Sequence, residues 1–260
     1  MNERQYDELW RSTWGDMQHV GPVHRHIQDD LLRVVRSLDV RTILDVGCGS
    51  GENLAALARE GRYTLTGTDL SPEALELTRR KVPGVETVVL DVQRDRLPGT
   101  YDLVMSIQVL EHLPDDGAAL ANMAAMSSRY VFASTMAGRM RKSEASIGHV
   151  RNYRWGELRE KMAGAGITVR WMRGWGFPLY SPLYRSIAEW LPGGPPAGTI
   201  SRPQRAVAAL LYYLYKLNVP GRGDVLSALG TVSPKDALDA ATIRRQVVSD
   251  TSDAGQVPTE

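Results

Sequence analysis

Three glycines in one short run are the residues whose spacing suggests chemistry most clearly. Gly47, Gly49 and Gly51 lie in the run LDVGCGSG at residues 44–51. The run follows a stretch that predicts a buried strand and precedes one that predicts a helix, the setting of a nucleotide-binding loop. Gly47 would permit a tight turn, and Gly49 would let a ligand approach the backbone closely. Because the spacing is not G-x-G-x-x-G and no P-loop lysine follows, phosphate is not the expected ligand.

Two aspartates stand at the ends of the next two predicted strands. Asp69 lies 20 residues after Gly49, and Asp91 ends the third strand. An acid at the first position can accept hydrogen bonds from both ribose hydroxyls. An acid at the second can accept one from an exocyclic amine such as that of adenine. Structural alternatives remain open: the glycines could serve a tight turn alone, and Asp69 could cap the helix that Ser71 and Pro72 begin.

An alternation of strands and helices must position these groups. Strands are predicted at residues 41–46, 63–68, 85–90, 101–107, 130–135, 167–173 and 224–231, and helices at 23–38, 52–60, 115–126, 155–163 and 203–217, with a further helix beginning at 71–72. Such alternation implies a mostly parallel sheet that helices cover on both faces. The glycine loop and both acids would then share the carboxyl edge of that sheet, where such folds bind ligands.

Four stretches of the chain resemble the class I S-adenosylmethionine-dependent methyltransferases. They are LDVGCGSG (44–51), GTDLS (67–71), LDVQ (90–93) and YDLVMSIQVLEHLPD (101–115), and they span most of residues 40 to 135. The end of the last stretch, VLEHLPD, is most similar to small-molecule methyltransferases of the ubiquinone-biosynthesis type. The resemblance implies an α/β, Rossmann-like fold. Its seven-stranded, mostly parallel sheet would have the order 3-2-1-4-5-7-6, with an antiparallel seventh strand and helices on both faces.

The resemblance also implies a binding site for S-adenosylmethionine. Asp69 would hold the ribose, and Asp91 would contact the adenine amine. Gly47 and Gly49 would pack against the methionine part, which Gln108 flanks from the fourth strand. Four further residues belong to the expected cofactor site: Asp45, Cys48, Leu70 and Val92.

The chain divides into three predicted parts. They are an N-terminal helical lid segment at 1–39, a methyltransferase domain at 40–232 that includes an insertion at 178–222, and a polar, partly mobile tail at 233–260. The seventh strand follows the insertion. The insertion departs from the minimal fold of the family, so it is expected to help determine the acceptor.

The N-terminal segment offers two candidate site residues. Tyr6, Trp10 and Trp14 share one helical face. Trp14 is therefore a candidate for substrate contact in an aromatic lid that excludes water, and packing is the alternative. Arg25, in the helix that follows, is the candidate for the cosubstrate's carboxylate, because N-terminal helices reach it in similar enzymes.

Histidines after the fourth and fifth strands are the candidate bases. His149 is the first candidate and His112 the second, because imidazole can take a proton near neutral pH. His149, Arg151 and Tyr153 alternate, so in an extended loop they would point to one side, and Arg151 and Tyr153 are the predicted substrate contacts. Two alternatives remain: an ordinary polar surface loop, and a Glu111-His112 pair that stabilises its own loop.

The composition argues against several classes of protein. Lys and Arg total 31 and Asp and Glu total 30, so the net charge of +1 argues against a dedicated nucleic-acid binder. The single cysteine, Cys48, rules out an internal disulfide framework and fits a reducing, cytoplasmic compartment. Cys48 lacks an obvious histidine partner, so packing is expected rather than nucleophilic chemistry. No H-x-x-x-H motif or cysteine pair indicates a metal site, so no metal is expected.

The longest apolar run, residues 207–217, bears on partners. It is too short to span a bilayer, which needs about 20 apolar residues, and the polar N-terminal stretch shows no signal-peptide core. The run predicts a core-facing or dimer-forming helix, so monomer and homodimer are both open. Its tyrosines and the nearby basic residues also suit peripheral contact with a membrane or a lipid-tailed substrate. These basic residues are Arg202, Arg205, Lys216 and Arg222.

The predicted function is methyl transfer from S-adenosylmethionine to an oxygen or nitrogen atom of a small-molecule acceptor, natural-product-like or lipid-like, with release of S-adenosylhomocysteine. The alternative is an S-adenosylmethionine-binding protein that acts on a peptide or protein, or that catalyses a non-methylating reaction. Amino methylation of nucleic-acid bases usually accompanies an Asn/Asp-Pro-Pro-Tyr motif after the fourth strand. Residues 106–109 read SIQV instead, so no nucleic-acid acceptor is expected.

Overall fold

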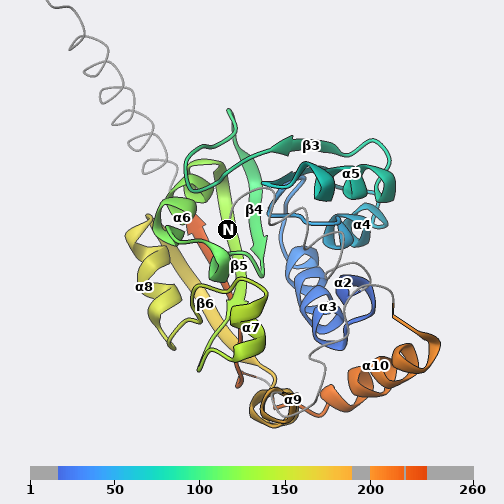
Figure 1. The fold of residues 1–260 in the computed structure, drawn as a ribbon. Coiled ribbons are helices and arrows are strands. Elements are labelled where there is room, and N and C mark those ends of the chain that lie inside the picture. Colours follow the sequence, from blue (N-terminus) through green and yellow to red (C-terminus); the bar gives the residue numbers. More distant parts are fainter. Residues whose placement is uncertain (1–16, 189–199, 220, 233–260) are drawn as a thin grey trace, which may run out of the picture.

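A seven-stranded sheet forms the centre of the molecule (Figure 1). The computed structural model describes residues 17–188, 200–219 and 221–232. The strands are β1 (Thr42–Val46), β2 (Thr64–Asp69), β3 (Glu86–Val89), β4 (Tyr101–Ile107), β5 (Ser127–Met136), β6 (Ile167–Trp175) and β7 (Val225–Val232). Their order is β3-β2-β1-β4-β5-β7-β6, and β7 runs antiparallel to both of its neighbours. The predicted fold class and strand order are therefore confirmed.

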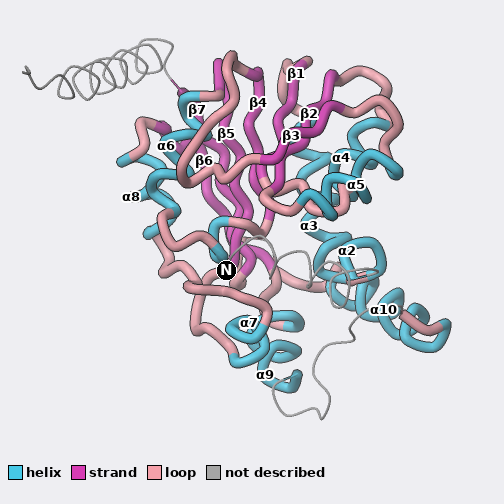
Figure 2. The backbone as a smooth tube through the Cα atoms, turned by 45° about the horizontal axis from the view of Figure 1, so that its top comes forward, coloured by secondary structure: helices cyan, strands magenta, loops and turns pink. Residues whose placement is uncertain are grey.

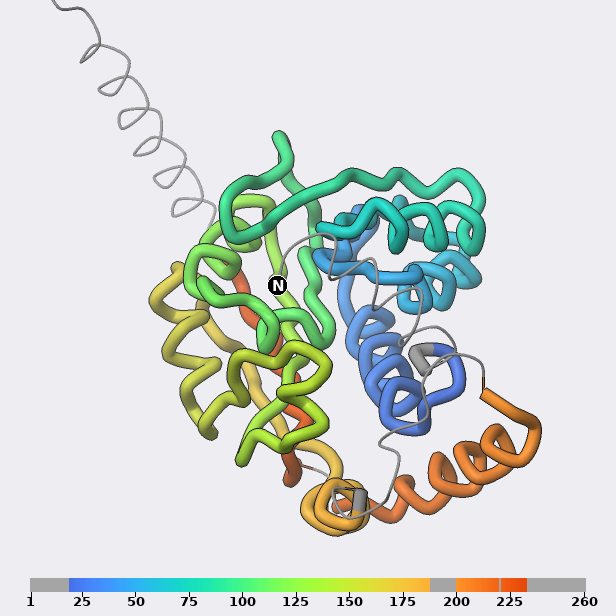
Figure 3. Tube along the Cα trace, in the orientation of Figure 1, coloured from blue at the N-terminus to red at the C-terminus, as the bar shows by residue number. Residues whose placement is uncertain are grey.

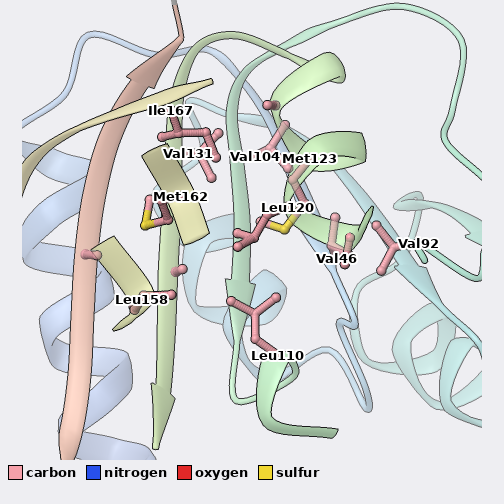
Figure 4. Packing of buried hydrophobic residues seen from close by; sticks show 14 of the residues in the cluster. Val46, Val92, Val104, Leu110, Leu120, Met123, Val131, Leu158, Met162 and Ile167 are labelled. Atoms are coloured by element: carbon pink, nitrogen blue, oxygen red, sulfur yellow. The ribbon is translucent and has the colours of Figure 1, made fainter. Parts of the chain in front are cut away.

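The central strands are apolar on both faces because helices cover both faces. Successive residues of a strand point to opposite sides, so on β1 Leu44 joins one core cluster and Ile43 joins another. Val104 and Leu103 of β4 divide in the same way. Figure 4 shows the first cluster, to which Val104 contributes from the sheet and Met123 from the helical layer.

Helices form a layer on each side of the sheet (Figure 2). They are α2 (Met17–Val20), α3 (Pro22–Arg36), α4 (Glu52–Ala58), α5 (Pro72–Lys81), α6 (Asp116–Ala125), α7 (Lys142–Ser146), α8 (Glu157–Gly164), α9 (Arg185–Ala188) and α10 (Arg202–Tyr215), with a 3-10 turn at Leu110–His112 and a π-helical turn at Leu179–Tyr184. Side chains of α3, α4 and α5 pack in the clusters of one face, and those of α6 and α8 in the cluster of the other. Each predicted strand and helix is present within a few residues of its predicted bounds.

The start of α5 shows how the sequence sets a helix boundary at the site. The Ser71 hydroxyl accepts a hydrogen bond from the amide of Ala74 at 3.1 Å, and Pro72 occupies the first helical turn. The serine cap satisfies an amide that has no partner within the helix. The helix start predicted at Ser71 and Pro72 is confirmed, and the Ser71 cap fixes the turn that follows Asp69.

Helix α10, which lies between β6 and β7 in the sequence, packs beside α2 and α3 (Figure 3). The Tyr212 hydroxyl donates to Asp29 at 2.6 Å, and the backbone carbonyl of Tyr212 lies 2.8 Å from His26 Nε2. The inserted helix and the N-terminal helices therefore form one packed unit.

Two predicted features lie outside the described residues: the aromatic face of Tyr6, Trp10 and Trp14, and the tail at 233–260. Among the residues that the structure describes, no helix has the length and apolar character needed to cross a membrane.

Candidate active site

The carboxyl edge of the sheet gathers most of the predicted site residues. The glycine loop follows β1, Asp69 ends β2, His112 follows β4, and the loop that carries His149 follows β5. These four strands are parallel, so the segments after them meet at one edge of the sheet.

The glycine loop is held against both of its neighbours in the sheet. Gly47 has a left-handed φ of 74°, and a Cβ atom there would lie 2.4 Å from Cγ2 of Val109. Glycine is therefore required by the backbone conformation and by the close approach of Val109. The amides of Gly47 and Cys48 both donate to the carbonyl of Thr68, at 2.7 and 2.8 Å. The loop thus contacts β2 on one side and, on the other, the segment that leads to His112.

The Asp69 carboxylate lies directly beside this loop. Its Oδ2 accepts a hydrogen bond from the Gly49 amide at 2.9 Å, and its Oδ1 accepts one from the Ser71 amide at 2.9 Å. Two amide donors fix the orientation of the carboxylate, which is largely buried. Asp69 therefore has a structural role in the turn after β2, and the predicted ribose contact would be added to that role.

Asp45, on β1 just before the glycine loop, is fully buried. Neither carboxyl oxygen has a hydrogen-bond partner among the described residues. Burial and the nearby Asp69 carboxylate raise the pKa of Asp45 to about 8. A buried carboxyl without partners is costly, and a positive charge placed beside it would lower that cost. Asp45 thus fits a cofactor that carries positive charge.

The other residues predicted to contact the cofactor differ in exposure. Cys48 is buried, and burial raises the pKa of its thiol, so it packs as a small residue and is not an activated nucleophile. Val92 is buried, whereas Leu70 and Asp91 are partly exposed at the edge. Asp91 accepts a hydrogen bond from the Gln93 amide at 3.1 Å.

Gln108, the residue after β4, has a conformation that non-glycine residues rarely adopt. Its φ is 57°, and its amide donates to the Ser134 carbonyl at 2.7 Å. The side-chain Nε2 is buried and has no hydrogen-bond partner in the part of the chain that the structure describes. Such strain is held by surrounding structure and is common at functional sites, which agrees with the predicted position of Gln108 beside the cofactor.

Arg25 has a different partner from the predicted one. Its guanidinium lies over the ring of Tyr212, 3.9 Å from the ring centroid. This cation–π contact joins α3 to α10. The structure therefore shows Arg25 in the interface between the N-terminal helices and the insertion, and its contact with the cosubstrate's carboxylate stays a prediction.

The two predicted bases come together from different loops. The ring centroids of His112 and His149 are 4.7 Å apart, with an edge-to-face angle of 73°. The Val150 amide donates to the Glu111 carbonyl at 2.9 Å and so ties the two loops together. Burial, together with His149, lowers the pKa of His112 to about 3, and burial lowers the pKa of His149 below its ordinary value. Both rings are therefore neutral near pH 7, the form that can accept a proton.

Glu111 is the third member of this cluster. Its Oε2 accepts a hydrogen bond from the Thr135 hydroxyl at 2.7 Å, and burial raises its pKa to about 7. Its Oε1 has no hydrogen-bond partner within the described ranges. One candidate ligand atom each of Glu111, His112 and His149 lies within 4.8 Å of the others. A divalent ion with bonds of about 2.1 Å would require all of these separations to be no more than about 4.2 Å.

Arg151 and Tyr153 point to one side, as their alternation predicts, but that side is the interior of the domain. The Tyr153 side chain is fully buried, and its hydroxyl donates to the Asp116 carboxylate. Arg151 forms an ion pair with the same carboxylate at 3.2 Å and donates to the Pro114 carbonyl at 2.8 Å. Both side chains therefore anchor the start of α6, which differs from their predicted role as substrate contacts. The sequence pattern identified the shared direction and could not identify Asp116 as the partner.

Three residues around His149 were not found from the sequence. The Asn152 side chain lies 3.1 Å from His149 Nδ1, and Glu144 and Arg185 lie behind it. The spacing of His149 and Asn152 within one loop is a weak signal that was available. Arg185 belongs to the insertion, 41 residues beyond Glu144, and no local pattern marks it.

Comparisons with known proteins agree with this geometry. Residues 43–128 match a family model described as a methyltransferase domain. A ubiquinone biosynthesis O-methyltransferase from Vibrio parahaemolyticus is 31% identical over 146 residues. That match covers 51% of this chain and 61% of the relative, so it extends over less than two thirds of the relative's length.

Solved structures share the fold at low sequence identity. A TehB-like S-adenosylmethionine-dependent methyltransferase from Corynebacterium glutamicum has a TM-score of 0.51 and 20% identity, over 79% of this chain and 88% of that one. The N-methyltransferase NodS from Bradyrhizobium japonicum, solved with S-adenosylhomocysteine, has a TM-score of 0.53 and 16% identity, over 82% of this chain and 88% of that one.

The sheet order, the glycine loop and the family match together define a class I S-adenosylmethionine-dependent methyltransferase domain. Within that class, the domain is similar to the small-molecule enzymes of the ubiquinone-biosynthesis type, as the VLEHLPD stretch predicts.

Proposed function

We propose that the chain transfers a methyl group from S-adenosylmethionine to an oxygen or nitrogen atom of a small-molecule acceptor and releases S-adenosylhomocysteine. One observation supports this most strongly: the glycine loop and the histidine pair meet at one edge of the sheet. Gly47 packs against Val109, which lies three residues before His112. A cofactor-binding loop and groups that can take a proton are thus immediate neighbours.

The residues at this edge fit the proposed cofactor. S-adenosylmethionine supplies a methyl group on a positively charged sulfonium. Asp45 offers two buried oxygens that have no partner among the described residues, and the proposal pairs that carboxyl with the positive charge. Asp69 would accept from the ribose, Asp91 from the adenine amine, and Gln108 would flank the methionine part. The same proposal includes contacts from residues that line the loop and strand ends: Gly47, Cys48, Gly49, Leu70 and Val92.

The chemistry asks the protein mainly to align the acceptor, the methyl carbon and the sulfur. An acceptor hydroxyl must also lose its proton during transfer, whereas an amine can need less help. In the proposal His149 takes that proton and His112 is the second candidate. His149 is unprotonated near pH 7 because burial lowers its pKa. Trp14 remains the proposed lid residue.

The surface of α10 supports a lipid-like acceptor or peripheral contact with a membrane. Val207 and Leu210 are 57% and 68% exposed on one side of α10, and Leu217, just beyond its end, is 71% exposed. The helix and its ends carry Arg202, Arg205 and Lys216 and no acidic residue. Apolar side chains among cations suit an anionic bilayer surface. The name of the Vibrio relative, a ubiquinone biosynthesis enzyme that methylates oxygen, supports the same class of acceptor.

A product assay tests the proposal directly. The full chain is incubated with methyl-labelled S-adenosylmethionine and a panel of phenols with and without long alkyl tails, small amines, a peptide mixture and RNA. We expect labelled product and S-adenosylhomocysteine with a tailed phenol or an amine. Label in the peptides would favour the alternative function, and label in the RNA would contradict the expected absence of a nucleic-acid acceptor.

Two controls sharpen this assay. Gly47→Val places atoms where Val109 lies, so product formation should cease. Treatment with a chelator should leave turnover unchanged, because the proposal includes no metal. If the chelator abolishes turnover and an added divalent ion restores it, the cluster of Glu111, His112 and His149 would instead be assigned to metal binding.

A further inference from the structure

The side chain of Asn152 lies between His149 and the carboxylate of Glu144. Asn152 Nδ2 donates to Glu144 Oε2 at 2.8 Å, and Asn152 Oδ1 lies 3.1 Å from His149 Nδ1. An ionised carboxylate can only accept hydrogen bonds, so the amide must turn its NH₂ group toward Glu144. Its oxygen then faces the imidazole, and an oxygen can bond to that nitrogen only if the nitrogen carries the proton.

Glu144 is itself held in place by donors from two directions. Its Oε2 also accepts from the Arg141 amide at 2.8 Å. Its Oε1 accepts from Arg185 Nε at 3.0 Å, and a second Arg185 nitrogen donates to the same oxygen. The Arg185 side chain is only 4% exposed and also pairs with Asp224, just before β7. These described groups, from Arg141, Asn152 and Arg185, all donate to the Glu144 carboxylate.

We infer that Glu144 and Asn152 are positioning residues that hold His149 as the Nδ1–H tautomer, leaving the lone pair on Nε2, and that Arg185 of the insertion fixes Glu144 for this task. The tautomer follows from donor and acceptor matching alone. Its catalytic meaning, that Nε2 is the atom that takes the acceptor's proton, rests on the proposed function. Arg185 of the insertion thereby contributes to the site through a part-buried chain of hydrogen bonds that runs by way of Glu144 and Asn152.

It matters which ring nitrogen carries the proton, because a neutral imidazole has one donor nitrogen and one acceptor nitrogen. If the proton were on Nε2, that atom could not take a proton from an acceptor hydroxyl. The charged and titratable groups around the ring are Glu111 and His112 from the loop after β4, Glu144 from α7, and Arg185 from α9. Among them, the carboxylate of Glu144 reaches His149 through the Asn152 amide.

Nitrogen NMR of the full chain with ¹⁵N-labelled histidine tests the tautomer without any need for activity. His149 is assigned by the signal that disappears in His149→Gln. At a pH where the ring is neutral, we expect the proton on Nδ1 in the wild-type protein. A proton on Nε2 would overturn the inference.

Glu144→Gln tests the cause of the preference. The glutamine oxygen would face Arg185, and its NH₂ group would face Asn152. The Asn152 amide would then have to turn over and present its own NH₂ to His149, so the proton should move to Nε2. Glu160→Gln, an exposed substitution of the same kind on α8, should leave the His149 signals unchanged. Wild-type signals in Glu144→Gln would contradict the inference.

Asn152→Leu provides a second variant in case Glu144→Gln does not fold. The leucine side chain is similar in size and offers no acceptor to Nδ1, so the imidazolium form loses a hydrogen bond. The pKa of His149 should therefore fall, and its NMR titration midpoint should move to lower pH. A base works only when unprotonated, so the acid limb of the rate profile should move to lower pH as well. An unchanged titration midpoint would refute the role of Asn152.

Turnover measurements separate this inference from the proposed function. With the acceptor found in the product assay, Glu144→Gln should lower kcat by about 10²-fold, the scale of general base catalysis, with little change in KM. If the NMR results are as expected and the wild-type chain methylates nothing, the tautomer assignment stands and the proposed function fails. If methyl transfer occurs and Glu144→Gln retains both the wild-type tautomer and kcat, the positioning role fails alone.

Discussion

The two halves of the carboxyl edge are built in different ways. In the cofactor half, after β1 and β2, Asp69 binds the amides of Gly49 and Ser71, so its partners are backbone groups of short motifs. In the acceptor half, after β4 and β5, His149 depends on Asn152, which depends on Glu144 and, through it, on Arg185 of the insertion. The first arrangement joins backbone groups of two short motifs at the ends of neighbouring strands, whereas the second is built from side chains and reaches Arg185, 41 residues beyond Glu144. A substitution in the acceptor half should therefore alter turnover while leaving the cofactor half intact.

His149→Ala should produce the largest effect. Loss of a general base costs about 10²- to 10⁴-fold in kcat, whereas the calorimetric affinity for S-adenosylmethionine should stay at the wild-type value. The lowered pKa of His149 also predicts that the acid limb of the wild-type rate profile lies below pH 6.5, the ordinary value for a histidine. Arg154→Ala, an exposed change in the same loop, serves as the control. Wild-type turnover in His149→Ala would remove this residue from the chemistry.

Asp69→Ala should weaken cofactor binding by about 10²-fold or more, because hydrogen bonds to a charged group contribute about 1.5–3 kcal/mol each. The change also leaves the amides of Gly49 and Ser71 without their partner, so the melting temperature should fall. Calorimetric titration with S-adenosylmethionine and S-adenosylhomocysteine measures the first effect. Asp95→Ala, on the exposed turn after β3, is the matched control. Unchanged affinity would mean that the cofactor half does not bind ribose through Asp69.

Tyr153→Phe should lower stability by about 2 kcal/mol, since it removes a buried hydrogen bond to the Asp116 carboxylate and keeps the ring. Urea denaturation followed by circular dichroism measures the change. Tyr213→Phe on α10 removes an exposed hydroxyl and should have little effect. The two variants should have the same KM for the acceptor. A raised KM in Tyr153→Phe, with wild-type stability, would restore the predicted substrate contact.

Asp45 should make cofactor binding release protons. With a pKa of about 8, the carboxyl is largely protonated at pH 7 in the free protein. A bound positive charge beside it favours the ionised form and lowers its pKa, so up to about one proton should leave on binding at pH 7 and almost none at pH 9.5. Titrations in buffers with different ionisation enthalpies measure this number. Asp45→Asn should abolish the buffer dependence, and a wild-type protein without that dependence would separate Asp45 from the cofactor's charge.

Much of the cofactor half could be predicted because its signals are short-range. The run at 44–51 carries its own turn, and Ser71 with Pro72 carries its own helix start, so positions in the chain translated directly into positions in space. The alternation of strands and helices was enough for the sheet order once the family resemblance was recognised.

The side-chain partners in the acceptor half could not be predicted from the sequence. The alternation of Arg151 and Tyr153 gave their common direction, yet Asp116, which accepts from both, lies on α6 more than 30 residues earlier in the chain. The guanidinium of Arg25 likewise lies over the ring of Tyr212, and no sequence motif connects this residue of the insertion to α3. Side-chain partners of this kind are set by how helices dock, and a single sequence does not encode that docking in a readable pattern.

The position of β7 has a consequence for how the chain is made. β7 lies between β5 and β6 in the sheet but follows both in the sequence, so β6 has no neighbouring strand until β7 has been synthesised. The two are separated by 49 residues, which at about 5–20 residues per second takes a ribosome about 2–10 seconds. Throughout that interval the nascent chain holds an unpaired strand, the kind of surface that promotes misassembly. We therefore expect the half of the protein that carries the insertion to be the more prone to misassembly during synthesis.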